Sequence, residues 1–185
     1  MLSAHMDHDL NVAGALALAL GDRLRDVTED AAGMSGPLPA ALASLREWAG
    51  GRPVDTLAGG LRLSHSRTVR VIDRLEAEGL ALRERDPADG RSVLVRLTPA
   101  GERAGAAVLA AREAALAQAL GGLEPHERRM FATLAERVLA ELTSGRRSAR
   151  TICRLCDGVA CGHHEGRCPV TQAADAAEAS ASAAA

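Results

Sequence analysis

Four cysteines near the C-terminal end are the residues of this chain whose type and spacing most clearly indicate chemistry. Cys153, Cys156, Cys161 and Cys168 follow the pattern C-x2-C-x4-C-x6-C. Two cysteines separated by two residues place both thiolates within reach of one ion, and two further soft ligands complete a tetrahedron. The pattern therefore predicts a metal site within residues 146–172, here called the Cys-rich segment, which metal binding would fold.

Zinc is the expected occupant, because it accepts four thiolates or three thiolates with one imidazole. An iron–sulfur cluster is the alternative, since four thiolates ending in Cys168-Pro169 also resemble cluster-binding loops of ferredoxins, although the spacings differ. Reduced or reversibly disulfide-bonded thiols without metal are the third possibility. His163 and His164 are expected to be bystanders, because the thiolates alone supply four ligands.

Composition narrows the class of protein. The chain has 185 residues and a net charge of -2, so any nucleic-acid contact must come from a local patch of its arginines. The N-terminus shows no basic segment followed by an apolar core, and the apolar run 11–20 is too short to span a bilayer. Cysteines confined to one cluster are also unlike the disulfides of secreted proteins. We therefore expect a cytoplasmic protein without a membrane partner.

Enzymatic activity is not expected. The sequence contains no glycine loop for phosphates, no Gly-x-Ser-x-Gly elbow and no His-Glu-x-x-His motif. A closed site of four thiolates would leave no position for a substrate. A thiol or metal redox enzyme remains the less favoured alternative.

A second group of residues suits contact with DNA. Ser64 is a good N-cap for a helix whose inner face carries Val69, Ile72 and Leu75. The start and outer face of that helix carry Ser64, Ser66, Arg67, Arg70 and Arg74. Hydroxyls can approach phosphates, and arginine can form paired hydrogen bonds to guanine. Arg74, further along, is better placed for the DNA backbone.

A charged hairpin follows this helix. Residues 80–82 and 93–97 alternate in the manner of strands, and residues 86–90 have the composition of a turn. Arg85 and Arg91 flank the turn, so one of them, preferably Arg91, could enter a narrow minor groove. Helix, turn, helix and hairpin together form a winged helix-turn-helix, which places its second helix in the major groove of double-stranded operator DNA.

Further helices must position this unit. Apolar seams predict a helix over residues 7–32, short helices from Pro37 and over 54–61, and long helices over 98–120 and from Pro125 to about 143. The expected fold class is mainly α with a small β wing. The long seams of the first and last helices would be uncovered in a lone chain, which favours a homodimer over an intramolecular bundle.

The sequence across residues 52–101 resembles the MarR family of regulators. The resemblance rests on the segments Leu63-Ser-His-Ser-Arg-Thr-Val, Ile72-Asp-Arg-Leu-Glu-Ala-Glu-Gly-Leu, Arg85-Asp-Pro-Ala-Asp-Gly-Arg and Val95-Arg-Leu-Thr-Pro-Ala-Gly. It implies an obligate dimer whose two winged helix-turn-helix units, the reading heads, bind a pseudo-palindromic DNA site. It also implies a repressor that is sensitive to a ligand or an oxidant, with an effector pocket between the dimer region and the reading heads.

Two departures from the family pattern stand out. Gly59-Gly60 occupies the third helix, where ordinary helix formers are usual, and the Cys-rich segment lies outside the common core. The expected organisation is a MarR-like domain over 1–145, with dimerisation parts 7–32 and 98–143 and a winged helix-turn-helix over 37–101. The Cys-rich segment 146–172 and a disordered tail 173–185 follow. A winged-helix module that binds a protein instead of DNA is the alternative function.

Overall fold

The computed structural model describes residues 7–87 and 93–183. Its helices are α1 (His8–Ala32), α2 (Leu38–Ser44), α3 (Val54–Leu61), α4 (His65–Ala77), α5 (Pro99–Ala119), α6 (Pro125–Glu141), α7 (Arg146–Ile152) and α8 (Pro169–Ala183). A π-helical turn, η1 (Leu45–Ala49), prolongs α2, and 3₁₀ turns η2 (Cys153–Leu155) and η3 (His163–Glu165) lie in the Cys-rich segment. The strands are β1 (Arg52–Pro53), β2 (Ala81–Arg85) and β3 (Val93–Leu97).

Residues 38–87 and 93–97 form a head with its own hydrophobic core. Leu42, Leu57, Ile72 and Leu75 are fully buried there, and Val95 closes the core from the sheet side. The predicted helix over 54–61 and the predicted hairpin are confirmed. The sheet has one strand more than we expected, because β1 pairs antiparallel with β3 through Arg52 opposite Val95, giving the order β1-β3-β2.

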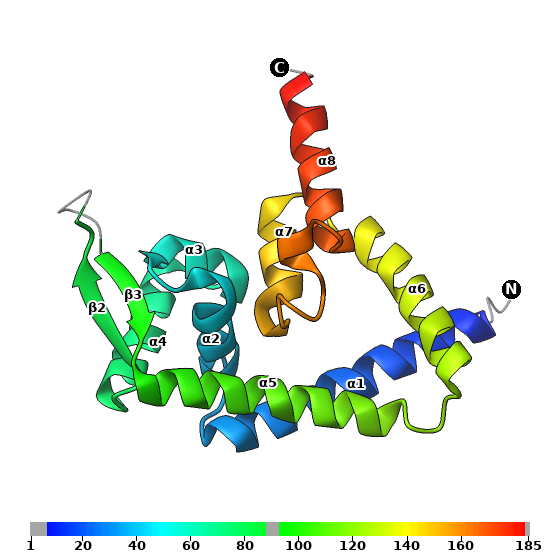
Figure 1. Ribbon diagram of the computed structural model, residues 1–185, viewed down its shortest axis with the longest axis horizontal. Coiled ribbons are helices and arrows are strands. Elements are labelled where there is room, and N and C mark those ends of the chain that lie inside the picture. The colour runs from blue at the N-terminus through cyan, green and yellow to red at the C-terminus, as the bar shows by residue number, and fades with distance from the viewer. Residues whose placement is uncertain (1–6, 88–92, 184–185) are drawn as a thin grey trace, which may run out of the picture.

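Two long helices carry the head. Thr98 caps α5 by accepting a hydrogen bond from the Gly101 amide at 3.1 Å, and Pro99 occupies the first helical position, as the sequence predicts. Helix α1 lies along α5, and α6 continues from the far end of α5, away from the wing (Figure 1). The main secondary structure is therefore helical with a small β wing.

The Cys-rich segment lies between the head and α6 in Figure 1. Helix α7 packs against α3, and α8 packs against both α6 and α7. Ala149, Cys168, Val170 and Ala174 are buried together and form a small second core with Leu139 of α6 at its border. Thus one side of the segment contacts the head, and the other contacts the long helices.

The expectation of a disordered tail from Ala173 is wrong for the described residues. Residues 169–183 form α8, whose Val170 and Ala174 are buried. Alanine has the highest intrinsic helix propensity, and two apolar anchors give this helix a surface to pack on. The composition of the tail does not reveal this packing surface, because α6 and α7 supply it.

No helix among the described residues is both long and apolar enough to cross a membrane.

Candidate functional site

Helix α4 begins with a tight cap. Ser64 has an extended backbone, its Oγ accepts a hydrogen bond from the Arg67 amide at 3.4 Å, and its carbonyl accepts one from the Thr68 hydroxyl at 3.0 Å. Thr68, Ile72 and Leu75 are buried against the rest of the head. One face of α4 is therefore fixed, which leaves its first two turns presented on the other face.

The presented face carries the residues that the sequence analysis selected. Ser66, Arg67 and Arg70 are exposed, and no ion pair within residues 7–87 and 93–183 involves either arginine. Arg74 is also exposed but forms an ion pair with Glu78 at 2.7 Å, one turn further along the helix. Arg67 and Arg70 are thus available to an external anion, whereas Arg74 must first exchange its partner.

The wing is tied to α4 by an arginine that the sequence analysis missed. Arg83 of β2 forms ion pairs with Glu76 and, at 2.7 Å, with Asp73, and its amide donates to Glu76 at 3.0 Å. The signal was present, because Asp73 and Glu76 are three residues apart and so share a helix face. These contacts fix the wing relative to α4, here called the reading helix.

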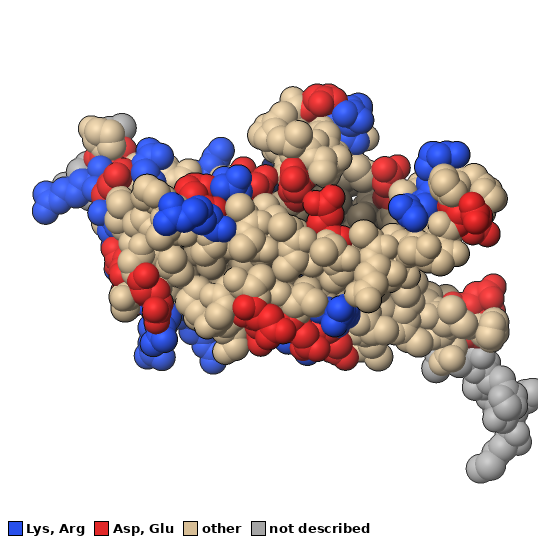
Figure 2. Space-filling model, turned by 60° about the horizontal axis from the view of Figure 1, so that its bottom comes forward, with Lys and Arg blue, Asp and Glu red and all other residues tan. Residues whose placement is uncertain are grey.

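The remaining arginines of the wing differ in their contacts and exposure. Arg96 pairs with Glu84 across the hairpin at 2.8 Å, so it supports the sheet. Arg85 is exposed at the end of β2, while Arg91 lies outside the described residues. Figure 2 shows arginine side chains gathered at the end of the molecule that carries the wing and α4, on a chain whose net charge is only -2.

The four cysteines meet at one cavity. All of them line a cavity of about 310 Å³ that is closed on the head side by Trp48 and Thr56. Cys168 is buried, and the other three are half-buried. Among the described residues, no three Cys, His, Asp or Glu side chains already stand close enough to share one ion. The sulfurs instead form two neighbouring pairs around the cavity, Cys153 with Cys156 and Cys161 with Cys168.

Charge around the cavity favours one thiolate in particular. A hydrogen bond from Cys153 lowers the pKa of Cys156, and Arg112 and Arg154 act in the same direction against the opposing effect of burial. The same hydrogen bond raises the pKa of Cys153. Burial raises the pKa of Cys161, and the neighbouring Cys168 adds to that effect.

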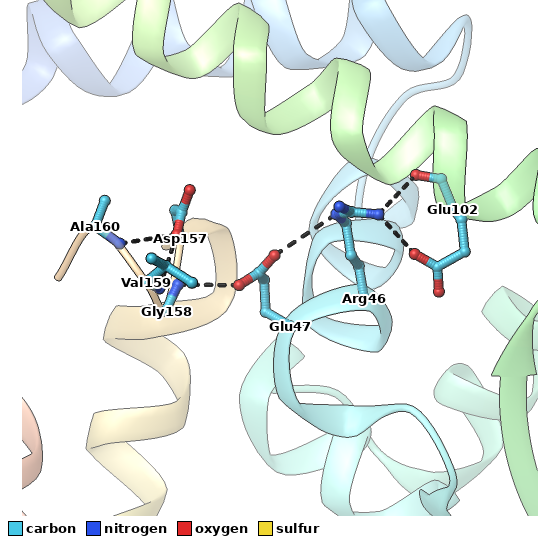
Figure 3. Close-up of polar contacts among 7 residues, drawn as sticks. All are labelled: Arg46, Glu47, Glu102, Asp157, Gly158, Val159 and Ala160. Atoms are coloured by element: carbon cyan, nitrogen blue, oxygen red, sulfur yellow. Dashed lines mark hydrogen bonds and ion pairs between the residues drawn. The ribbon is translucent and has the colours of Figure 1, made fainter. Parts of the chain in front are cut away.

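The loop that carries Cys161 is ordered from both sides. The Asp157 carboxylate accepts hydrogen bonds from the amides of Val159 and Ala160 at 2.8 and 2.9 Å. On the head side, Glu47 accepts from the Gly158 amide at 2.9 Å. These side chains belong to a continuous row of polar contacts, drawn in Figure 3.

That row extends into the long helices. Arg46 lies 3.6 Å from Glu47 and forms an ion pair with Glu102 of α5 at 2.6 Å. Its guanidinium also donates to the Glu102 carbonyl at 3.2 Å. The loop of the Cys-rich segment, the π-helical turn of the head and the first turn of α5 are therefore linked through three side chains (Figure 3).

The glycine pair of α3 is where the Cys-rich segment meets the head. The Gly59 carbonyl accepts a hydrogen bond from Thr151 at 3.3 Å, and Ser44 donates to the Arg154 carbonyl at 3.1 Å. A Cβ at Gly60 would lie 2.6 Å from the Trp48 ring and 3.5 Å from the Arg150 carbonyl. The departure from ordinary helix formers thus has a structural reason, because Gly60 admits both Trp48 and α7.

This arrangement predicts opposite effects of two neighbouring substitutions. Gly59→Ala meets no atom within 4 Å and should gain up to about 1 kcal/mol in stability from helix propensity. Gly60→Ala gains the same propensity but collides with Trp48 and should cost about 1–3 kcal/mol in total. Urea unfolding of both variants measures the difference, and equal stabilities would show that Trp48 moves aside freely.

A groove also lies between the end of α1 and the reading helix. Glu29, Asp30, Met34 and Arg74 contribute to its walls. This is the region, between the long helices and the head, where the family resemblance implies an effector site. Its acidic wall and single arginine are the chemical features that a ligand would meet.

The fold and the presented face of α4 define a winged helix-turn-helix protein of the kind that binds DNA. Residues 40–93 match the sequence model of the MarR family. A probable transcriptional regulator from Pseudomonas aeruginosa is 31% identical, with 68% of this chain and 95% of that one covered and a TM-score of 0.54. A MarR family protein from Bacillus stearothermophilus is 27% identical, with 75% and 99% covered and a TM-score of 0.65. The chain belongs to the MarR family.

The match to a curated protein sequence covers less of the chain than the structural matches do. The uncharacterized HTH-type transcriptional regulator YkoM of Bacillus subtilis is 32% identical over 91 residues, which are 49% of this chain and 59% of YkoM. The chain thus spans little more than half of that curated relative.

Proposed function

We propose that this protein is a sequence-specific transcription regulator that binds double-stranded operator DNA. In this proposal the first turns of α4 enter the major groove, and the wing reaches the adjacent minor groove with one of Arg85 and Arg91, preferably Arg91. The observation that carries it is the exposed face of α4, where Arg67 and Arg70 have no ion-pair partner among the described residues while the opposite face is buried. A helix held this firmly can present its arginines without further ordering.

We further propose that the regulator acts as a homodimer. Apolar side chains are exposed along α1 at Leu10, Leu16 and Leu18, and along α6 at Met130, Leu134 and Val138. The three residues of α6 are spaced by four positions and so share one face of that helix, and both helices extend away from the wing (Figure 1). Because large contiguous apolar patches are rare on monomers, a second copy of the same chain is the occupant that we propose. It would bring two reading heads to the two halves of one operator.

Repression under the control of a small molecule, a metal or an oxidant completes the proposal. The groove beside Arg74 and the cavity lined by cysteines are the two places where such a signal could act on the head. A protein of this kind works in the cytoplasm, where the operator is accessible.

Replacement of one reading arginine tests the DNA-binding proposal. Arg70→Ala should weaken binding to an operator selected from random DNA by about 1–3 kcal/mol, because a paired hydrogen bond to a base is lost. Fluorescence anisotropy with labelled duplex measures the change. Arg129→Ala, on the exposed polar face of α6, removes an equal charge far from α4 and should leave affinity unchanged. Equal losses in both variants would remove Arg70 from base readout.

A further inference from the structure

The Cys-rich segment lies between the head and α6 and packs against both. Cys153 and Cys156 follow α7, which packs against α3 of the head. Cys168 directly precedes α8, which packs against α6. A bond between the first and the second pair of sulfurs therefore links the α3 side of the head to α6 through α7 and α8.

The surroundings of the cavity suit an anionic metal centre. Four thiolates around a divalent ion leave two uncompensated negative charges, which are costly to bury unless cations lie nearby. Arg52 and Arg150 line the cavity together with the four cysteines. Two carboxylates at the loop are already engaged: that of Glu47 by Gly158 and Arg46, and that of Asp157 by the amides of Val159 and Ala160. Cationic side chains thus lie around the cavity, where a centre of four thiolates needs them.

We propose that Cys153, Cys156, Cys161 and Cys168 together hold one thiophilic metal centre per chain, and that this centre fixes α7 to α8. The shared chemistry is coordination by four thiolates, which suits either a zinc ion or an iron–sulfur cluster. The two sulfur pairs face one cavity, so the centre forms by drawing them together across it. The position of the head relative to α6 then depends on whether the centre is present.

The docking contacts make this dependence specific to α3. Thr151 and Arg154 contact the head within a few residues of Cys153 and Cys156, through Gly59 and Ser44. Glu47 contacts the loop between the two pairs. When the centre is lost, α7 stays joined to α8 only by the small core around Ala149 and by the ion pairs of Arg146, and the contacts with the head lose part of their support. Helix α3 packs against the reading helix α4, so the effect reaches the DNA-binding face.

Metal analysis of the full chain, purified without oxygen, tests the site itself. We expect either one zinc per chain, or iron with an equal amount of inorganic sulfide and a visible absorption band; these results separate the two kinds of centre. Cys156→Ser and Cys168→Ser should each lose most of the metal, whereas His163→Ala should retain it. Wild-type protein with four reactive thiols and no metal would overturn the proposal, as would full metal content in both serine variants.

Amide hydrogen exchange tests the link between α7 and α8 without any DNA. Loaded wild-type protein and protein stripped by a chelator are compared, and exchange in α3 and α7 should be at least several-fold faster in the stripped sample. Exchange in the part of α1 remote from the segment is the internal control. Equal protection of α3 in both samples would show that the centre fixes nothing.

Operator affinity provides the third measurement and rests on the proposed function. Coupling between two sites in a regulator typically changes affinity by roughly 5- to 150-fold, and we expect a change of this size between loaded and stripped protein. Because metal content and amide exchange are independent of DNA, a protein that binds no operator at all would contradict the proposed function alone. A protein that binds operator equally well in both forms would contradict the coupling alone.

Discussion

Leu134→Asp is expected to convert the protein from a dimer to monomers or aggregates and to abolish operator binding at micromolar concentration. Leu134 lies at the middle of the exposed apolar row of α6 and is 53% exposed in the single chain. In the proposed dimer this side chain is buried, and an unpaired buried charge costs about 3–5 kcal/mol. Two-fold symmetry places the substitution in the interface twice, so the loss exceeds that of any single contact.

Ala132→Asp provides the matched control. It introduces the same acidic side chain two residues away, on the opposite and exposed side of α6. Sedimentation velocity should show a dimer for wild type and for Ala132→Asp but not for Leu134→Asp. Circular dichroism establishes whether the monomer retains its helices. A wild-type protein that sediments as a stable monomer would contradict the dimer proposal.

The head could be predicted from sequence because its signals are local and agree with one another. Ser64 as a helix cap, the buried row Ile72 and Leu75, and the turn between two alternating strands each fix one element within a few residues. Strand β1 was missed because two residues are too few for any alternation to appear. Its pairing is decided by β3, which lies far along the chain.

The C-terminal region could not be predicted in the same way. Cysteine spacing indicated one site, but not that the site would lie against α3, since that depends on the space left by Gly60 beside Trp48. From the sequence, the glycine pair is expected only to lower the stability of α3, whereas in the fold it forms the surface that Trp48 and α7 contact. Likewise Arg83 looks like any charged strand residue until Asp73 and Glu76 are placed beside it.

Salt is expected to have the largest effect on operator binding. Each phosphate contact made by an arginine releases condensed counterions, so the logarithm of affinity falls linearly with the logarithm of salt concentration. A dimer with about 6–10 such contacts loses roughly 10³- to 10⁵-fold in affinity between about 50 and 200 mM salt. The arginines gathered at the wing end of the molecule make a steep slope the expected result (Figure 2).

The slope also separates DNA binding from the alternative of a protein-interaction module. A packed protein interface relies on apolar burial, which salt does not weaken in this way. Anisotropy titrations at several salt concentrations, repeated with Arg67→Ala, should show a slope shallower by about one contact per head. Arg129→Ala should reproduce the wild-type slope. A flat dependence in the wild-type protein would mean that the exposed face of α4 binds something other than a polyanion, since arginines without phosphates release no counterions.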